Sequence, residues 1–246
     1  MKGIFITVRT GSKRFPKKCL KKIVGKYAVE LVIDRAKRSK TADEIVLCTT
    51  RLSEDDILRE IALKNKIGVY SGSENDKLLR WRGAAEKYFI DFFVTFDGDD
   101  LLCDPGLADL AFKQHGKTGA DFIQAPHVPT GAFTYGIAKS ALDKVCDIKG
   151  SDNTENMVPY FTDTGLFKVE PLFDVPQALQ RPELRMTMDY PDDLTFFDNI
   201  YNHFLNFTLE DAIEYLDDNP EVVEINRHCQ QWYLQNQKKM PKAVLK

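Results

Sequence analysis

Short hydrophobic runs alternate with segments of helical spacing through the first half of the chain. Four runs are rich in Ile, Val and Phe, as expected of strands that are buried on both faces of a sheet. These runs are GIFITV (3–8), EIVLCTT (44–50), IGVY (67–70) and DFFVTFD (91–97). The pattern therefore predicts four buried strands.

Helical patterns separate these runs. One buried helical face follows the i, i+3, i+4, i+7 spacing at Val29, Val32, Ile33 and Ala36. Residues 53–66, SEDDILREIALKNK, predict a second helix with Ser53 as its N-cap and acids in its first turn. This alternation favours a parallel or mostly parallel sheet sandwiched by helices, a Rossmann-like α/β fold.

The second half of the chain is less regular. Residues 121–126 and 132–138 predict strands, and the connection HVPTG between them indicates a hairpin or a pause in the alternation, where a flap over a site could be built. Residues 185–204 predict a strand that runs into a helix, with Pro191 in the first helical turn. Two further helices are expected, at 208–217 and at about 220–235.

Composition indicates the size of the hydrophobic core and the cellular compartment of the protein. The 246 residues, 43% of them hydrophobic, are enough for one large domain. The five Cys are odd in number and far apart, so we expect reduced thiols with structural roles. No stretch approaches the ~20 apolar residues of a membrane span, and the apolar run at 4–8 is too short for a signal peptide. We therefore expect a cytoplasmic protein.

Charge is segregated along the chain, although the net charge is only −3. Residues 1–40 hold 13 Lys or Arg and two acids, whereas residues 189–224 hold 11 acids and no Lys or Arg. The whole molecule is therefore not a general polyanion binder. Its two oppositely charged ends could fold together, or could serve a ligand and a metal separately.

The basic segment VRTGSKRFPKKCLKK (8–22) directly follows the first predicted strand. Ligands in open α/β sheets bind at the carboxyl ends of the strands, so this loop is the first candidate site. Gly11 permits close backbone approach, and the N–H groups of Gly11 and Ser12 could bind phosphate oxygens. Arg9, Arg14 and Lys18 add positive charge. We interpret the loop as a polyphosphate site; a solvated or RNA-attracting patch is the alternative.

Carboxylates also occur at the ends of two later predicted strands. Asp97, Asp99 and Asp100 follow the fourth run, and Asp189 ends the alternating stretch RMTMD. Carboxylate oxygens suit Mg²⁺, which also binds substrate phosphates. Asp99 and Asp189, completed by triphosphate oxygens and water, would form an octahedral site. A solvated turn with Asp at helix caps is the alternative for the first group.

These stretches resemble the cytidylyltransferases that activate acidic sugars, a group including CMP-Kdo synthetase, CMP-sialic acid synthetase and the spore-coat polysaccharide cytidylyltransferase-like proteins. RTGSKRFPKKCL (9–20) is similar to the family's R-x-x-S-x-R-x-P-x-K-x-L. The similarity continues in order through CTTRLSEDD (48–56), VYSGSENDKLLRW (69–81), FDGDDLLCDP (96–105), ENMVPYF (155–161) and MTMDYPDDLTFF (186–197). It covers about residues 1–205.

The resemblance implies the nucleotide-diphospho-sugar transferase fold and a single cytidylyltransferase domain over residues 1–246. Within it we expect a β-rich excursion at about 121–170, for acceptor binding or dimerisation, and a helical segment at about 206–246. The implied reaction transfers CMP from CTP to an acidic sugar or a related phosphate or phosphonate, with release of pyrophosphate, for cell-surface polysaccharide precursors. The expected partners are CTP, a small acceptor and a second copy in a homodimer, with no nucleic acid and no membrane.

The resemblance also implies roles for individual residues. The triphosphate would be held by Arg9, Gly11, Ser12, Arg14 and Lys18. The nucleoside would lie along Ser71, Gly72 and Ser73. Mg²⁺ would be held by Asp99 and Asp189, and the catalytic residues would be Lys18, Arg14 and Asp99.

The acceptor side departs from the family pattern. Relatives carry G-x-D-x-E where this chain has GAFTY (131–135), so Phe133 and Tyr135 replace two acids. Glu155 is kept, whereas Asn156 stands where relatives carry His. With these four as acceptor-binding residues, a pocket that loses carboxylates should bind a less hydroxylated or more anionic acceptor.

Two other functions stay open at this point. A glycosyltransferase of the related nucleotide-sugar fold would need an Asp-x-Asp metal motif, which DGD at 97–99 fits nominally. A non-catalytic nucleic-acid binder could use the basic N-terminal segment. It is disfavoured because Phe15 is the only aromatic residue among those basic residues and because the chain is acidic overall.

Overall fold

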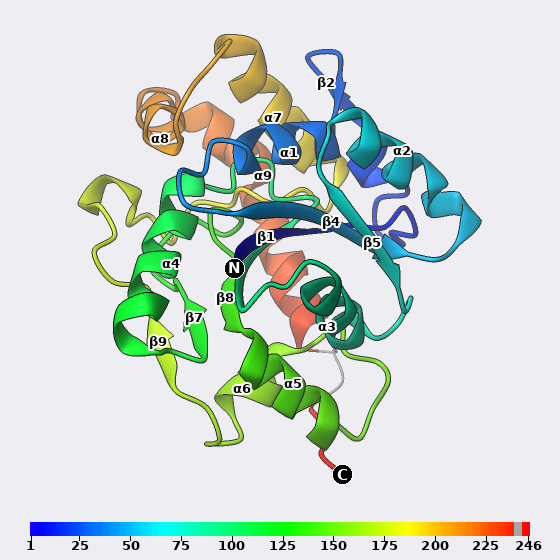
Figure 1. The fold of residues 1–246 in the computed structure, drawn as a ribbon. Coiled ribbons are helices and arrows are strands. Elements are labelled where there is room, and N and C mark those ends of the chain that lie inside the picture. Colours follow the sequence, from blue (N-terminus) through cyan, green and yellow to red (C-terminus); the bar gives the residue numbers. More distant parts are fainter. Residues whose placement is uncertain (239–242) are drawn as a thin grey trace.

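The main sheet is mostly parallel and places the first predicted strand near its middle. A computed structural model describes residues 1–238 and 243–246, and within them the sheet has seven strands in the order β5-β4-β1-β6-β8-β7-β9 (Figure 1). The strands are β1 (Lys2–Thr7), β4 (Glu44–Thr50), β5 (Gly68–Gly72), β6 (Phe92–Asp97), β7 (Phe122–Gln124), β8 (Tyr135–Ala138) and β9 (Val169–Pro171). β8 runs antiparallel to β6 and β7, and the other pairs are parallel.

Helices cover both faces of this sheet. In Figure 1, α1, α2 and α7 lie on one side and α3 and α5 on the other. The helices are α1 (Ala28–Ala36), α2 (Asp56–Lys64), α3 (Lys77–Lys87), α4 (Pro105–Thr118), α5 (Lys139–Ile148), α6 (Val158–Thr162), α7 (Pro191–His203), α8 (Leu209–Asp218) and α9 (Pro220–Gln237). A separate two-stranded ribbon, β2 (Lys22–Ile23) with β3 (Lys26–Tyr27), follows the basic loop.

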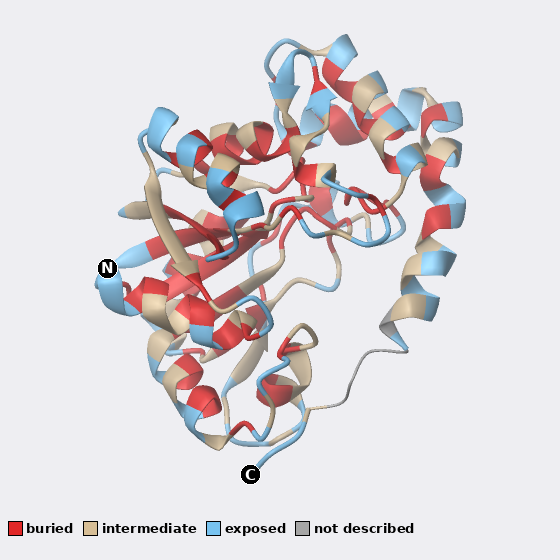
Figure 2. Cartoon of the chain, turned by 90° about the vertical axis from the view of Figure 1, so that its right-hand side faces the viewer, coloured by how far each residue is buried: buried red, intermediate tan, exposed pale blue. Residues whose placement is uncertain are grey.

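The core lies between the sheet and these helices, where Figure 2 shows the buried residues concentrated. Phe5 of β1 and Phe93 of β6 are fully buried and stack with ring centroids 4.3 Å apart. Burial of one such side chain stabilises the fold by about 1.5–3 kcal/mol. The central strands are therefore a rigid base for the loops at their ends.

The fold predicted from the sequence is confirmed in its main features. The four hydrophobic runs form β1, β4, β5 and β6, and the predicted pair of later strands forms the antiparallel neighbours β7 and β8. The predicted helices at 208–217 and about 220–235 correspond to α8 and α9. Residues 239–242 of the expected C-terminal helical segment lie outside the described residues.

Two local predictions are wrong. Ser53 does not cap α2, because Ser53–Asp55 forms a short 3₁₀ helix (η2) before α2 begins at Asp56. Residues 185–189 do not form a strand; a single bridge joins Arg185 to Thr130. The apolar alternation there does not mark a strand, because the polar residues Arg185 and Thr187 are buried too and the backbone bonds to two loops.

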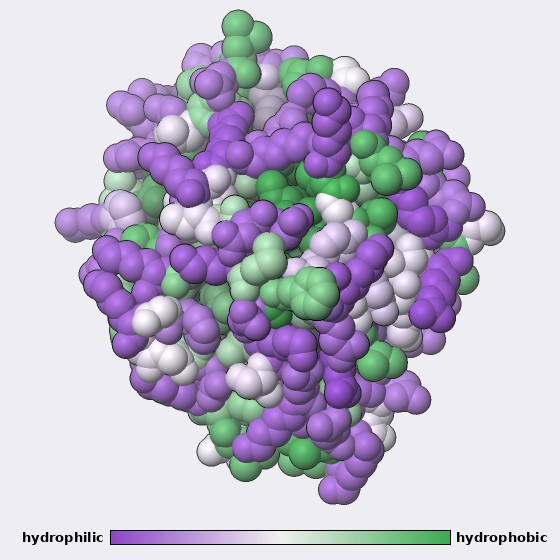
Figure 3. All heavy atoms as spheres, viewed as in Figure 1, coloured by the Kyte–Doolittle hydropathy of each residue, from purple (hydrophilic) through white to green (hydrophobic). Residues whose placement is uncertain are grey.

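The face shown in Figure 3 is largely hydrophilic, with hydrophobic residues in small separate groups. All five cysteines are buried and free, as expected of reduced structural thiols. In residues 1–238 and 243–246, no helix has the length and apolar character needed to span a bilayer.

Candidate active site

A cleft of about 950 Å³ opens at the carboxyl ends of β1 and β6. These strands are neighbours, and the chain continues from β1 to β4 on one side and from β6 toward β8 on the other. Loops that leave adjacent strands in opposite directions open a crevice between them. The walls come from both loops, from residues 124–135, 153–158 and 187–189, and from the end of α9.

The basic loop after β1 is held in place by its own buried side chains. Phe15 and Cys19 are buried, and the Thr10 N–H donates to Asp55 Oδ1 at 2.8 Å. Lys17 takes a left-handed φ of 53°, which is unfavourable for a residue with a side chain. Lys18 follows as the first residue of a short 3₁₀ helix (η1, Lys18–Leu20) and lines the cleft.

Gly98 lets the loop after β6 lie directly against the end of β1. Its N–H donates to the Thr7 carbonyl oxygen at 2.9 Å, and a Cβ at this position would lie 2.6 Å from the side chain of Val8. Any larger residue would therefore push the two loops apart. The close approach carries Asp99 toward the basic loop.

Asp189 reaches the same point from a distant part of the chain. The Met188 N–H donates to the Asp99 carbonyl oxygen at 2.9 Å, which places residues 188–189 beside the loop after β6. The carboxylate of Asp193 accepts hydrogen bonds from the N–H groups of Asp189 and Tyr190, at 2.8 and 2.9 Å, and so caps the start of α7. A helix N-terminus thus fixes Asp189 without a strand.

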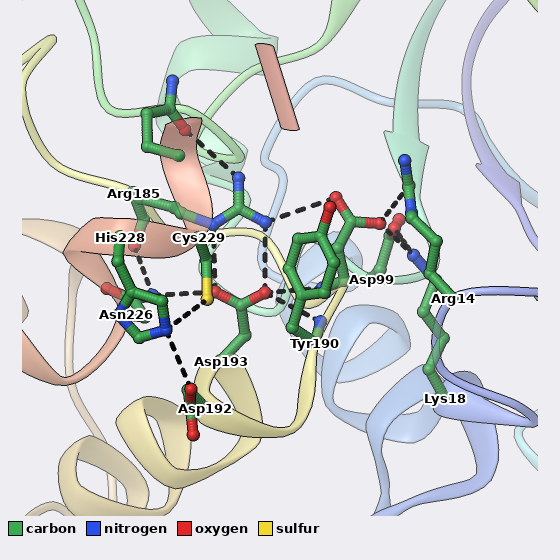
Figure 4. A network of polar contacts seen from close by, with 12 residues as sticks. Arg14, Lys18, Asp99, Arg185, Tyr190, Asp192, Asp193, Asn226, His228 and Cys229 are labelled. Atoms are coloured by element: carbon green, nitrogen blue, oxygen red, sulfur yellow. Dashed lines mark hydrogen bonds and ion pairs between the residues drawn. The ribbon is translucent and has the colours of Figure 1, made fainter. Parts of the chain in front are cut away.

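Lys18 lies between the carboxylates of Asp99 and Asp189, and Figure 4 shows Lys18 beside Arg14 and Asp99. Its Nζ contacts Asp99 Oδ2 and is 2.8 Å from Asp189 Oδ1, and Arg14 pairs with the same Asp189 oxygen. Burial by itself would lower the pKa of Lys18. The negative charges of Asp99 and Asp189 outweigh this effect and raise the pKa overall. Burial likewise opposes ionisation of Asp189, but Lys18 and Arg14 lower its pKa. Two carboxylates from distant segments therefore converge on one cation.

A third carboxyl group lies beneath this pair. Asp100 is buried, and its Oδ2 accepts a hydrogen bond from Thr134 Oγ1 at 3.2 Å. Burial, assisted by the charges of Asp99 and Asp97, raises the pKa of Asp100 well above its usual range. Asp100 therefore holds its proton more tightly than an exposed Asp does, and burial also raises the pKa of Asp99, although Lys18 opposes this shift.

The opposite wall is aromatic and polar. Phe133 and Tyr135 lie on it, together with Glu155 and Asn156. Arg9 joins this wall to the basic loop, because its Nη2 lies 3.0 Å from Glu155 Oε1. The lining of the cleft thus combines the cations of the basic loop with aromatic rings.

The sequence profile of the cytidylyltransferases matches residues 4–240, nearly the whole chain. The chain belongs to the cytidylyltransferase family. A basic loop after β1 that faces Asp99 after β6 and Asp189 before α7 is the arrangement that transfer of a nucleotidyl group needs. The nucleotidyltransferase activity and the use of CTP follow from this membership.

Individual proteins are similar to this cytidylyltransferase over most of its length. An uncharacterized protein of Methanocaldococcus jannaschii is 31% identical over 230 residues, which cover 92% of this chain and 94% of the relative. The spore coat polysaccharide biosynthesis protein SpsF of Bacillus subtilis is 25% identical, with 80% and 84% covered. The solved structure of a cytidylyltransferase from Leptospira borgpetersenii superposes with a TM-score of 0.83 at 28% identity, covering 90% of this chain and 96% of that one.

Most residues singled out in the sequence line one cleft of the cytidylyltransferase. They are Arg9, Gly11, Ser12, Arg14, Lys18, Asp99, Phe133, Tyr135, Glu155, Asn156 and Asp189. The Ser12 N–H already donates to the Thr10 carbonyl oxygen at 2.8 Å. A phosphate would have to compete for that N–H or use the Gly11 N–H instead.

The residues expected along the nucleoside lie elsewhere. Gly72 and Ser73 line a second hollow of about 690 Å³ beside β5. The Ser71 hydroxyl accepts from Arg59 Nη1 at 3.4 Å, and the Ser73 hydroxyl accepts from the Asp76 N–H at 3.1 Å. The structure therefore does not bring Ser71, Gly72 and Ser73 to the wall of the main cleft.

Several cleft residues of the cytidylyltransferase escape sequence reasoning, among them Lys77 and Arg80 of α3 and two residues of α9. Tyr233 and Asn236 lie at the end of α9 and line the cleft. Asn236 Nδ2 donates to the Tyr190 hydroxyl at 3.0 Å, which ties this end of α9 to the start of α7. The only signal in the sequence is their spacing of three residues, which puts both on one face of a helix.

Replacement of Asp193 by Asn should strongly destabilise the cytidylyltransferase. Asp193 accepts from Arg185 Nε at 2.9 Å, and Arg185 Nη2 also donates to Asp189 at 3.2 Å; the three side chains are almost fully buried. Loss of the partner leaves a buried guanidinium undercompensated, at a cost of about 3–5 kcal/mol. Thermal unfolding should therefore shift down by roughly 10 °C.

The control for this stability measurement is Asp192→Asn in metal-free buffer. Asp192 is half exposed, and within the described part of the chain its ion pair is with His228. An exposed pair of this kind contributes about 0–1 kcal/mol. Equal unfolding temperatures for the two variants would contradict the role given to the Arg185–Asp193 pair.

Replacement of Gly131 by Ala should distort the wall that carries Phe133. Gly131 has a φ of +96°, and an added Cβ would lie 2.1 Å from the Met186 carbonyl oxygen and 3.1 Å from Asp100 Oδ1. We expect the free energy of unfolding, measured with denaturant, to fall by at least about 1–3 kcal/mol, since backbone strain alone costs this much. Gly116→Ala is the control, because nothing lies within 4 Å of its added Cβ in α4; a helical Gly→Ala change should stabilise slightly.

Proposed function

We propose that this cytidylyltransferase transfers CMP from CTP to an acidic sugar, or to a related phosphate or phosphonate acceptor, in a Mg²⁺-dependent reaction that supplies precursors of cell-surface polysaccharides. The observation that carries the proposal is the meeting of Lys18, Asp99 and Asp189 in the cleft. An acceptor oxygen forms a bond to the α-phosphorus. The bond from that phosphorus to its bridging oxygen breaks, and pyrophosphate leaves with the electron pair.

The protein's main contributions are position and charge. Phosphoryl transfer needs aligned reactants and neutralisation of the charge that develops on the phosphates. Arg14 presents a planar guanidinium able to bind two phosphate oxygens, and Lys18 presents a compact ammonium. Both reach the cleft from a loop whose buried residues Phe15 and Cys19 hold its backbone in place.

The residues present fit a divalent cation. Oxygens of Asp99 and Asp189 contact the same Lys18 ammonium, so both lie within reach of one small ion. Carboxylate oxygens together with substrate phosphates are the ligands that Mg²⁺ prefers. Asp99 and Asp189 would hold the ion, which when bound supplies positive charge to the phosphates. Lys18, released from the two carboxylates, would contact the triphosphate.

The aromatic wall supports an acceptor with few hydroxyl groups. Phe133 is almost fully buried, and the Tyr135 ring stacks on Phe122 with centroids 5.1 Å apart. Glu155 is already paired with Arg9, so its charge is not offered to sugar hydroxyls. An acidic acceptor would be attracted by the basic loop across the cleft. The similarity to SpsF, named for polysaccharide biosynthesis, supports the same pathway.

The alternative hypothesis, a glycosyltransferase, rests only on the DGD segment at 97–99. Asp97 Oδ1 lies 3.5 Å from Lys77 Nζ, whereas Asp99 pairs with Lys18. The two carboxylates of the segment are thus directed to different cations. This arrangement favours the nucleotidyltransferase proposal over a two-carboxylate Asp-x-Asp metal site.

The deciding experiment incubates the purified chain with CTP, Mg²⁺ and a panel of sugar acids, sugar phosphates and phosphonates. Pyrophosphate release with a cytidylylated product, identified by mass spectrometry, supports the proposal and names the acceptor. Pyrophosphate release only with uncharged sugars would overturn the acidic-acceptor part. Release of nucleoside diphosphate from a nucleotide sugar, with no pyrophosphate from CTP, would support the glycosyltransferase.

We propose that the protein forms a homodimer and that the segment carrying β9 forms the interface. β9 is at one edge of the main sheet, and Leu166 and Phe173 beside it are 45% and 47% exposed. An unpaired strand edge with exposed apolar side chains suits pairing with a second copy. A mass measurement in solution by light scattering tests this, and a monomer at all concentrations would contradict it.

A further inference from the structure

Three side chains with metal-binding atoms meet between α7 and α9, at the opposite end of the polar network from Lys18 (Figure 4). Asp192 comes from the first turn of α7, and His228 and Cys229 come from α9. His228 Nε2 lies 2.9 Å from Asp192 Oδ2 and 3.6 Å from Cys229 Sγ. All three ligand atoms lie within 4.8 Å of one another.

We propose that Asp192, His228 and Cys229 form a binding site for a thiophilic divalent metal of the Zn²⁺ class. Zinc bonds of about 2.0–2.1 Å to N or O and about 2.3 Å to S, at a tetrahedral angle, separate a nitrogen and a sulfur ligand by about 3.6 Å. That is the separation found between His228 Nε2 and Cys229 Sγ. The distance between Asp192 Oδ2 and His228 Nε2 would increase by a few tenths of an ångström to admit the metal.

The donor set distinguishes this site from the one proposed for Mg²⁺. Mg²⁺ takes oxygen ligands, as Asp99 and Asp189 offer, whereas nitrogen and thiolate ligands favour Zn²⁺ and its neighbours. An ordinary histidine–carboxylate ion pair also explains the contact of His228 with Asp192. The sulfur of Cys229, the next residue of α9, lies beside the same nitrogen and adds a third ligand atom to this pair.

The free thiol does not ionise easily. Burial raises the pKa of Cys229 to about 12. A metal must therefore displace the thiol proton, as soft divalent metals do. Three protein ligands leave a fourth position for water, which suits the half-exposed His228 and Asp192.

A metal at this site would join α7 to α9. Asp193, next to Asp192, accepts from Asn226 Nδ2 of α9 at 3.0 Å and from Arg185, which also contacts Asp189. The Trp232 ring packs edge-on against His228, with centroids 4.8 Å apart. The metal would therefore stiffen the helix that supplies Tyr233 and Asn236 to the cleft.

Titration of chelator-treated protein with Co²⁺, in excess Mg²⁺, tests the proposal by absorbance. Co²⁺ substitutes for Zn²⁺ and shows a thiolate charge-transfer band when sulfur is a ligand. We expect one equivalent to give this band, Cys229→Ser to lose it, and His228→Gln to weaken binding at least tenfold. Absence of the band in the wild type, or its persistence in Cys229→Ser, would overturn the proposal.

Matched controls use residues of the same types at other places. Cys146→Ser changes another buried thiol, and His203→Gln changes a histidine at the end of α7 that packs on Tyr215; both should keep the band. Loss of the band in these controls as well would count against the site. His228 is about half exposed, so His228→Gln should fold even if Cys229→Ser does not. Zn²⁺ should raise the unfolding temperature of the wild type and not of His228→Gln; an equal rise in both would also overturn the proposal.

Discussion

Replacement of Lys18 by Met is expected to lower pyrophosphate release from CTP by about 10²–10³-fold, the usual effect of removing one preorganised charge at a reacting centre. Met keeps much of the side-chain volume and removes the ammonium that contacts Asp99 and Asp189. The fold should persist, because Asp189 keeps its pairs with Arg14 and Arg185. Steady-state rates and circular dichroism measure the two effects separately.

The same variant should bind a divalent cation more tightly when CTP is absent. In the wild type the Lys18 ammonium neutralises Asp99 and Asp189, and an ion must displace it. Mn²⁺ affinity, measured by electron paramagnetic resonance, should therefore rise while turnover falls. Lys22→Met is the control, since Lys22 is exposed and lies over the Tyr27 ring, outside the cleft. Unchanged turnover in Lys18→Met would show that Lys18 takes no part in the reaction.

The sequence predicts the parallel β5-β4-β1-β6 part of the sheet and the position of the cleft for one reason. Parallel strands end at the same edge, so chemical groups that follow β1 and β6 meet there regardless of the helices between them. The basic loop with Lys18 and the acids with Asp99 both follow buried strands. Their convergence is therefore visible from order and burial alone.

Sequence reasoning fails where tertiary contacts decide the path of the backbone. The stretch before Asp189 alternates in sequence, but Arg185 and Thr187 are buried as well as Met186 and Met188, in a segment that bonds to loops. An alternating sequence looks the same with or without a ladder of backbone hydrogen bonds. The return of α9, which delivers Tyr233 and Asn236, depends on the buried Arg185 cluster and has no local signal.

Replacement of Asp99 by Asn is expected to abolish the Mg²⁺-dependent part of CTP binding and to lower turnover by about 10²–10³-fold. Asn has the same shape but carries no charge, so Lys18 would pair with Asp189 alone. One carboxylate and one amide would then face the triphosphate where two carboxylates stood, and Mg²⁺ binds a neutral amide oxygen far less strongly. Calorimetric titration with CTP, with and without Mg²⁺, separates the metal-dependent affinity from the affinity supplied by the basic loop.

Asp97→Asn is the matched control, two residues earlier at the same strand end. Asp97 pairs with Lys77 and Asp99 with Lys18, so only the second change touches the cation shared with Asp189. A nucleotidyltransferase that uses Asp99 with Asp189 should lose metal-dependent CTP binding in Asp99→Asn and keep most of it in Asp97→Asn. A metal site built on the DGD segment requires equal losses in both variants. Equal losses would therefore move the metal from the Asp99–Asp189 pair to the Asp97–Asp99 pair, and the transferred group would have to be sought again.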